Sequence, residues 1–244
     1  YSSAGTIVEV GAGMGEFKPG DRVACAGGGY AVHAEYDLVP LNLLAKLPDC
    51  VDFESAAFTT LGAIAMHGFR LSSPQIGETV IIIGLGLLGL LAAQIARAAG
   101  CVVFGIDLSP DRVKLAQDLG FSAALNENCL DLVSGMTDGR GFDHVLICAD
   151  TSSDETVLLA GQVARDRGSV VSVGAVGLDI PRKIYYEKEL NLIVSRSYGP
   201  GRYDPQYEEN GLDYPPGYVR WTEGRNLQSF VDLLADGKVD VKPL

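Results

Sequence analysis

The sequence lacks paired cysteines, clusters of basic residues and any apolar run long enough to cross a bilayer. Its five cysteines are scattered, with no CxxC pair, so we expect reduced thiols, as in a cytoplasmic protein, rather than disulfides. The net charge of −12 argues against nucleic acid or an anionic membrane surface as a partner. The longest apolar stretch, Val80–Ala93, is interrupted by glycines and is too short for a membrane span.

The composition is that of a globular protein with room for two modest domains. The chain has 244 residues, of which 47% are hydrophobic and 20% are charged. It begins at Tyr1 within a β-like pattern, and residues 237–244 follow directly on a predicted helix. We therefore expect it to be part of a longer polypeptide.

From residue 51 to residue 236, apolar strands alternate with helical patterns. The predicted strands are Val80–Gly84, Val102–Ile106, Ala123–Leu125, His144–Cys148, Ser169–Val173 and Leu190–Ser195. The predicted helices are Phe53–Phe69, Leu87–Ala99, Pro110–Leu119, Cys129–Met136, Asp154–Arg167 and Asn226–Ala235. Apolar strands separated by helices are typical of a parallel sheet that is covered on both faces. The sequence therefore predicts an α/β fold with a doubly wound parallel sheet of the Rossmann type.

Two other segments have a different pattern. Residues 1–50 are rich in glycine and predict short strands at Thr6–Val10, Arg22–Ala26 and Ala34–Val39, as in a small β domain. Residues 198–224 contain several tyrosines and prolines, and so many aromatic residues predict an ordered loop.

A glycine motif joins the first predicted strand of the sheet to its helix. Gly84 permits the tight turn, Gly86 lets a pyrophosphate approach the backbone, and Gly89 lets the helix pack on the strand. The amides of Leu87 and Leu88 then lie at the helix N-terminus, where the dipole favours an anion. The motif predicts binding of a dinucleotide.

An acidic residue, Asp107, follows the next strand. Its carboxylate can accept hydrogen bonds from the adenosine ribose and would repel a 2′-phosphate, which predicts NAD as the cofactor. A helix-capping role before Pro110 is the alternative reading. Arg112 is a candidate to stack on the adenine, although an exposed helix arginine is equally compatible with the pattern.

Further cofactor contacts are expected where later strands end, because ligands bind at the carboxyl ends of parallel strands. Cys148 follows the fourth strand and is expected near the adenosine. Val173 and Gly174 follow the fifth strand, close to the expected nicotinamide, and Ser195 ends the sixth.

Several motifs together resemble the medium-chain dehydrogenase/reductase superfamily. They are Gly20-Asp-Arg-Val23, Ala34-Glu-Tyr36, Leu47-Pro48 and Thr137-Asp-Gly-Arg-Gly-Phe-Asp143, combined with the glycine motif. The resemblance implies a partial GroES-like catalytic domain over residues 1–50, a Rossmann domain over residues 51–236 and a return segment over residues 237–244. It also implies an alcohol dehydrogenase-like oxidoreductase that transfers hydride to or from a carbonyl or alcohol.

Many members of that superfamily use a catalytic zinc, and the residues expected to bind it are absent here. Tyr1-Ser2 stands where the family has His-Glu, and Thr60 stands where it has a cysteine or glutamate ligand. The four cysteines of the structural zinc lobe are also missing. A hydroxyl or phenol is a poor replacement for thiolate, imidazole or carboxylate. We expect a zinc-independent enzyme.

Without a metal, hydrogen-bond donors must stabilise the developing oxyanion. The candidate catalytic residues are Tyr30, Thr60 and Tyr198, with Tyr30 equally readable as an aromatic plug. His33, in the same loop as Tyr30, is a further candidate proton donor.

The segments 195–204 and 218–223 resemble bacterial two-module oxidoreductases, in which a zinc-lacking medium-chain module precedes a Gfo/Idh/MocA-type module. This resemblance suggests a C-terminal fusion partner and a sugar or nucleotide-sugar substrate. The strand at 190–195 is a candidate edge for a homodimer. Two alternatives remain open, an NADPH-dependent quinone or enoyl reductase-like enzyme and a non-catalytic NAD-binding module.

Overall fold

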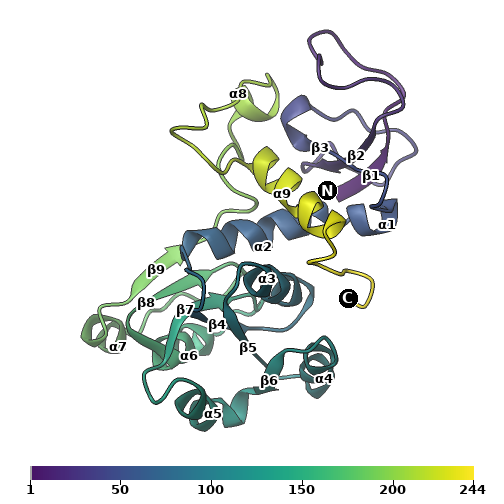
Figure 1. The fold of residues 1–244 in the computed structure, drawn as a ribbon. Coiled ribbons are helices and arrows are strands. Elements are labelled where there is room, and N and C mark those ends of the chain that lie inside the picture. Colours follow the sequence, from purple (N-terminus) through teal and green to yellow (C-terminus); the bar gives the residue numbers. More distant parts are fainter. Residues whose placement is uncertain (1) are drawn as a thin grey trace. The chain divides into compact units, whose positions relative to one another are not determined.

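The structure is a computed structural model that describes residues 2–244, the side chains of Asn128 and Asp131 excepted. The chain forms two compact units. The parallel-sheet unit comprises Gly68–Ser195, and the antiparallel unit comprises the residues up to His67 together with Arg196–Leu244 (Figure 1). Each unit has its own core and is described separately.

The parallel-sheet unit contains six parallel strands in the order β6-β5-β4-β7-β8-β9. They are β4 Thr79–Ile83, β5 Val102–Asp107, β6 Ser122–Leu125, β7 Phe142–Ile147, β8 Ala164–Ser172 and β9 Asn191–Val194. All six were predicted, and their order is that of a Rossmann fold, which confirms the predicted fold class. β9 is an edge strand of this sheet.

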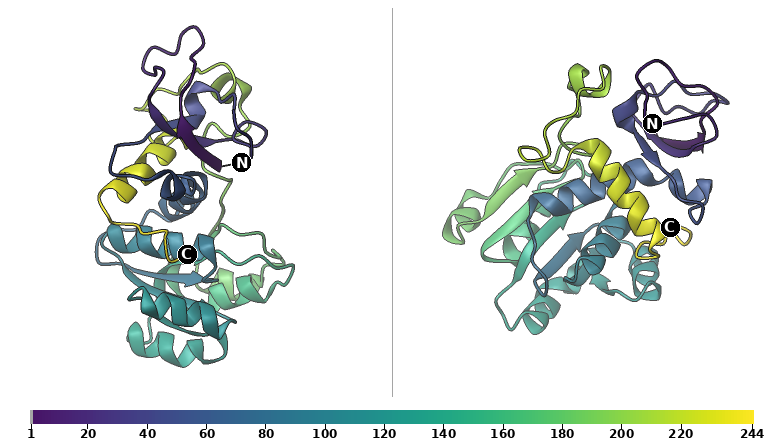
Figure 2. Two further views of the ribbon diagram at one scale, coloured as in Figure 1. Left: turned by 90° about the vertical axis from the view of Figure 1, so that its right-hand side faces the viewer. Right: turned by 45° about the horizontal axis from the view of Figure 1, so that its top comes forward.

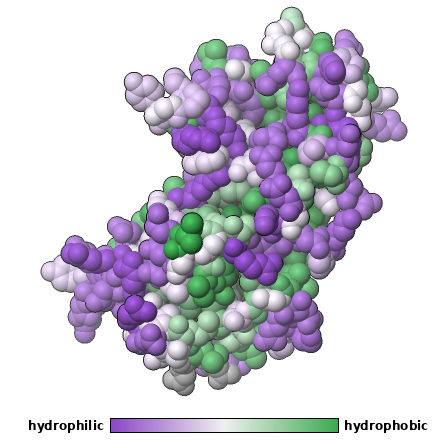
Figure 3. All heavy atoms as spheres, viewed as in Figure 1, coloured by the Kyte–Doolittle hydropathy of each residue, from purple (hydrophilic) through white to green (hydrophobic). Residues whose placement is uncertain are grey.

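Helices lie on both sides of this sheet (Figures 1 and 2). They are α3 Leu87–Ala98, α4 Pro110–Asp118, α5 Cys129–Met136, α6 Glu155–Val163 and α7 Arg182–Glu187, with a 3-10 turn at Asn126–Asn128. Buried side chains of α5, α6 and α7 form one core with β4, β5, β7 and β8. Figure 3 shows hydrophobic side chains gathered over this unit on the face viewed. Leu130, Leu132 and Met136 of α5 are exposed.

One helix prediction in this unit is too long. The pattern predicted a helix over Asp154–Arg167, but α6 ends at Val163 and β8 begins at the next residue. Ala164 pairs with Phe142 of β7, and Arg165 forms an ion pair with Asp143 at 2.6 Å. These pairings with a neighbouring strand outweigh the local helical preference.

The antiparallel unit contains the sheet β1-β2-β3. Its elements are β1 Ser2–Thr6, β2 Arg22–Ala26, a 3-10 turn at Leu41–Leu43, β3 Leu44–Lys46, α1 Phe53–Ala56, α8 Pro205–Glu208 and α9 Glu223–Ala235. The helix α2 spans Thr59–Leu71, and the boundary between the units falls within it. None of the helices in residues 2–244 combines the length and the apolar composition needed to cross a bilayer.

Two strand predictions in this unit are corrected. The strand expected at Thr6–Val10 lies earlier, at Ser2–Thr6, where it pairs with β2. The strand expected at Ala34–Val39 is absent from the described residues. There Tyr36 is 75% and Leu38 is 91% exposed, so the alternating apolar side chains have no buried face to stabilise a strand.

The two compact units have other boundaries than the predicted domains, which were divided at residues 50 and 236. Residues 51–67 and 196–236 group with the antiparallel sheet, because α1 and α9 share a buried core with β2 and β3. Ala56, Leu227 and Val231 belong to that core. The segment 198–224 is partly helical, and it buries Tyr198 and Tyr207.

Candidate functional site

The glycine motif forms a tight turn between β4 and α3. Gly84 has a φ of +96°, a conformation that favours glycine. A Cβ on Gly89 would lie 1.8 Å from the carbonyl oxygen of Gly84, so no side chain fits there. At Gly86 the nearest heavy atom to such a Cβ is the guanidinium carbon of Arg112, at 3.9 Å. The backbone at Gly86 is therefore open to a ligand.

The N-terminus of α3 is the second part of this cradle. Gly86 is its N-cap, in extended conformation, and it offers no side-chain cap. A helix leaves its first amides without intrahelical acceptors, and here these include the amides of Leu87 and Leu88. Amide donors at a positive dipole end, beside a glycine without a side chain, fit a pyrophosphate. The described residues therefore fit a dinucleotide.

Asp107 lies at the carboxyl end of β5 and is 8% exposed. Its Oδ2 accepts a hydrogen bond from the Leu85 amide at 2.7 Å, and its Oδ1 accepts one from the Ser109 amide at 2.8 Å. Arg112 Nη1 lies 3.6 Å from Oδ2. A carboxylate has about four acceptor positions, so Asp107 can hold the glycine loop and still accept ribose hydroxyls.

The remaining predicted cofactor residues follow neighbouring strands of the same sheet. A Cβ on Gly174 would lie 2.0 Å from the carbonyl oxygen of Ala149, so only glycine fits. Ser195 carries a buried hydroxyl that has no hydrogen-bond partner among the described residues. Burial raises the pKa of the Cys148 thiol to about 12, so this thiol stays protonated at neutral pH and is not an activated nucleophile. Val173 packs against Gly68, where a Cβ would lie 2.5 Å from its methyl group.

The three predicted catalytic residues all belong to the antiparallel unit. Tyr198 is 2% exposed and lies in the core against which the half-buried Tyr30 packs. Thr60 is fully buried, and its Oγ1 lies 3.5 Å from the carbonyl oxygen of Cys25. Partial burial and the nearby Glu209 carboxylate raise the pKa of Tyr30, which keeps its phenol protonated as a hydrogen-bond donor. Of the three, Tyr30 is the most exposed.

Sequence reasoning missed a polar cluster beside Tyr198. Arg202 Nη1 lies 2.5 Å from Glu208 Oε1, and its guanidinium lies 5.5 Å from the ring centre of Tyr198. The same guanidinium lies 3.9 Å from the ring centre of Tyr203. A Cβ on Gly28, in the loop that carries Tyr30, would lie 3.8 Å from Arg202 Nη2. The motifs at 195–204 and 218–223 contain arginines, acids and tyrosines that indicate a polar cluster, but a sequence motif does not reveal which charges pair.

Glu223 completes this cluster as a buried acid. It begins α9, is 0% exposed, and neither of its carboxyl oxygens has a hydrogen-bond partner among the described residues. The Tyr198 hydroxyl is likewise buried without a partner in that part of the chain. Burial, with a smaller contribution from Glu208, raises the pKa of Glu223 to about 9. Glu223 is therefore uncharged at neutral pH.

Among the side chains that the structure describes, no three from His, Cys, Asp or Glu are grouped closely enough to hold a metal ion. Burial raises the pKa of the Cys25 thiol, beside Thr60, to about 11. His33 lies in an exposed part of the loop.

The chain is similar to known dehydrogenases along most of its length. Residues 88–209 match a family model described as zinc-binding dehydrogenase. The chain is 31% identical over 243 residues to a sorbitol dehydrogenase from Halalkalibacterium halodurans, covering 84% of this chain and 69% of that protein. It is 32% identical over 213 residues to an alcohol dehydrogenase from Geobacillus stearothermophilus, covering 76% of this chain and 62% of that protein.

A solved structure shares the fold over almost the whole chain. The crystal structure of galactitol-1-phosphate dehydrogenase from Escherichia coli aligns with a TM-score of 0.79 at 25% identity, covering 99% of this chain and 74% of that one. The chain thus spans about two thirds of the length of the curated relatives that it matches. By its Rossmann sheet, its glycine motif and these relatives, the chain belongs to the zinc-binding dehydrogenase family, within the alcohol dehydrogenase-like medium-chain superfamily.

Proposed function

We propose that the chain is the dinucleotide-binding part of an NAD(H)-dependent oxidoreductase that acts on a hydroxyl or carbonyl group of a polyol or sugar. The observation that carries the proposal is the cradle formed by Gly84, Gly86 and Gly89 beside the carboxylate of Asp107. The names of two relatives, sorbitol dehydrogenase and galactitol-1-phosphate dehydrogenase, support a polyol as the substrate class.

Asp107 supports NAD over NADP. A carboxylate that is 8% exposed at the end of β5 would repel a 2′-phosphate at that position. Arg112, the nearby cation, is 3.6 Å from the same carboxylate, which offsets its charge. A structure of a dehydrogenase from Sinorhizobium meliloti, 24% identical, is described as bound to NADP, so the competing cofactor needs a direct test.

In this proposal the chain's own residues bind the pyrophosphate, orient the ribose and stabilise negative charge on the substrate oxygen. The nicotinamide of a bound cofactor supplies the hydride acceptor or donor. The amides of Leu87 and Leu88 hold the pyrophosphate, and Asp107 orients the ribose. The protonated phenol of Tyr30 donates a hydrogen bond to the substrate oxygen as negative charge develops on it. We propose that this hydrogen bond from Tyr30 replaces zinc, because Thr60 offers only a buried hydroxyl where the family has a metal ligand.

The decisive experiment compares NADH and NADPH dissociation constants by fluorescence titration. We expect NADH to bind about tenfold more tightly or better, since one repelled charge corresponds to about 1.4 kcal/mol or more. Asp107→Asn keeps one acceptor oxygen but removes the charge, and it should bring the two constants within about threefold of each other. Asp118→Asn is the matched control, because Asp118 is an exposed acid that pairs with Lys114 on α4. Tighter binding of NADPH by the unaltered protein would refute the assignment.

Metal analysis tests the zinc-independent part of the proposal separately. We expect hydride transfer to persist after dialysis against a chelator, with Tyr30→Phe lowering kcat by about tenfold or more. Activity that is lost on chelation and restored by zinc alone would overturn this mechanism, while leaving the assignment of the dinucleotide unaffected.

A further inference from the structure

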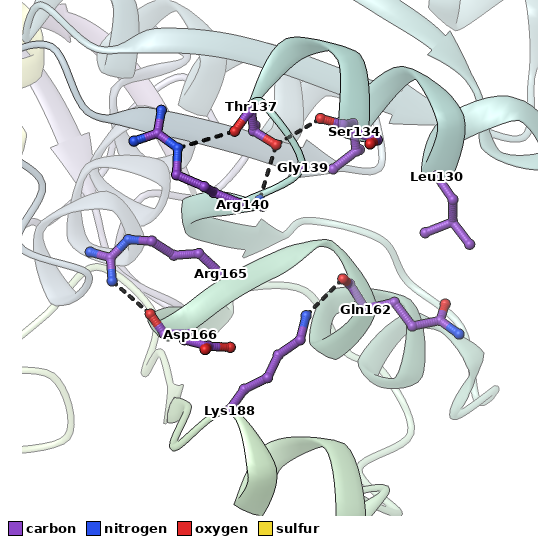
Figure 4. A pocket seen from close by; sticks show the side chains of 11 residues that line it. Leu130, Ser134, Thr137, Gly139, Arg140, Gln162, Arg165, Asp166 and Lys188 are labelled. Atoms are coloured by element: carbon purple, nitrogen blue, oxygen red, sulfur yellow. Dashed lines mark hydrogen bonds between the residues drawn. The ribbon is translucent and has the colours of Figure 1, made fainter.

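A cavity of about 560 Å³ lies at the amino ends of β7 and β8. It is lined by α5, the loop that precedes β7, the end of α6, the start of β8 and the segment that precedes β9 (Figure 4). The glycine motif follows β4, at the carboxyl edge of the same parallel sheet. The cavity is therefore at the opposite edge from the dinucleotide cradle, and all of its lining belongs to one unit.

The charge of the lining is opposite to that of the chain. Three cationic side chains, Arg140, Arg165 and Lys188, face the cavity with one carboxylate, Asp166. The chain as a whole carries a net charge of −12. A cavity lined mainly by cations concentrates the potential that attracts an anion, although the ion pair with Asp143 offsets part of the charge of Arg165.

Lys188 is held in place by the end of α6. Its Nζ donates hydrogen bonds to the carbonyl oxygens of Gly161, Gln162 and Ala164, at 2.9, 2.9 and 2.6 Å. Burial lowers the pKa of Lys188, and Asp166 opposes that effect. Carbonyl dipoles at a helix C-terminus offset a cation without neutralising it. Lys188 therefore contributes positive potential rather than a free donor.

The two arginines retain free donors. Arg165 uses Nε for Asp143 at 2.6 Å and Nη1 for the carbonyl oxygen of Asp166 at 2.8 Å, which leaves Nη2 without a bond to the described residues. Arg140 donates through Nε to the Thr137 carbonyl at 3.2 Å and lies only loosely beside Asp138, at 3.8 Å. The planar guanidinium group of an arginine can donate two parallel hydrogen bonds to the oxygens of a phosphate.

The other side of the cavity is less polar. Leu130 and Val133 of α5 line it, together with the side chains of Ser134 and Gln162. A ligand could thus place its charged group against the arginines and a small uncharged body against α5. From these features we propose that the cavity binds a phosphate monoester of a small hydroxylated molecule, as a second ligand site distinct from the dinucleotide cradle.

The test is calorimetric titration of the whole chain with ribose 5-phosphate at low ionic strength, with NADH present in excess so that the cradle is occupied. We expect saturable binding that ribose without phosphate does not show. Arg140→Ala should weaken binding by about fivefold, the loss of one charge-assisted hydrogen bond. The Arg140 side chain is 76% exposed, so this variant should keep its fold.

Asp166→Asn gives a result that general loss of structure could not mimic. Removing the one carboxylate from the lining should tighten binding by about threefold or more. Arg182→Ala is the matched control, because Arg182 lies on α7, stacks on Tyr186 and is not part of the cavity. The proposal is overturned if ribose 5-phosphate shows no saturable binding, if ribose binds equally well, or if Arg140→Ala and Asp166→Asn both leave the affinity unchanged.

Discussion

The buried carboxyl group of Glu223 makes a quantitative prediction about pH and stability. Its pKa is raised from 4.5 to about 9 in the folded chain, chiefly by burial. Between these two values the folded chain keeps the proton and the unfolded chain releases it. Stability from this group is therefore fully present below pH 4.5 and is lost as the pH rises through 9.

The magnitude follows from linkage. One proton released on unfolding lowers the free energy of unfolding by about 1.4 kcal/mol for each pH unit. Between pH 6 and pH 8 the contribution of Glu223 should therefore fall by about 3 kcal/mol. Glu223→Gln keeps the size and polarity of the neutral acid but cannot ionise. Its unfolding free energy should depend less steeply on pH, by about 1.4 kcal/mol per unit over that range.

The assay is urea denaturation at several pH values from 6 to 8, for the unaltered chain and for Glu223→Gln. Glu209→Gln is the control, because Glu209 is an exposed acid near the same cluster, and it should leave the slope against pH unchanged. Equal slopes for the unaltered chain and Glu223→Gln would refute the reasoning, since Glu223 would then be ionised in the folded chain.

Two further predictions concern single side chains. Gly89→Ala should lower the free energy of unfolding by about 3 kcal/mol and abolish NADH binding, because its Cβ would lie 1.8 Å from the Gly84 carbonyl oxygen; unchanged denaturation and titration curves would contradict the cradle geometry. Tyr198→Phe should change stability by less than about 1 kcal/mol, because the buried hydroxyl has no partner among the described residues. A large loss of stability in a denaturation curve would show that this hydroxyl is bonded, whereas a loss of turnover at unchanged stability would support its predicted catalytic role.

The parallel-sheet unit could be predicted closely because its signals are local. Apolar runs such as Val80–Gly84, glycines that end helices and the motif that starts at Gly84 each restrict the backbone through neighbouring residues. The place of Asp107 at a strand end could be predicted for the same reason, and its role toward the cofactor stays a prediction. The structure adds that its carboxylate also holds the Leu85 amide.

The antiparallel unit could be predicted only in part, because its elements depend on distant partners. β1 is placed by its pairing with β2, and the exposed pattern around Tyr36 has no such partner. The end of α6 at Val163 is similarly decided by β7. No local pattern contains this information.

What the sequence by itself determined is a Rossmann sheet with a dinucleotide cradle, because turns, helix ends and apolar strands are encoded within short segments. Only the tertiary structure decided which side chains became buried or paired. It removed the carboxyl group of Glu223 from water, paired Arg202 with Glu208, and gathered Arg140, Arg165 and Lys188 around one cavity. Burial and charge pairing join residues far apart in the chain, and the pKa values and ligand preferences that follow from them are properties of the folded molecule.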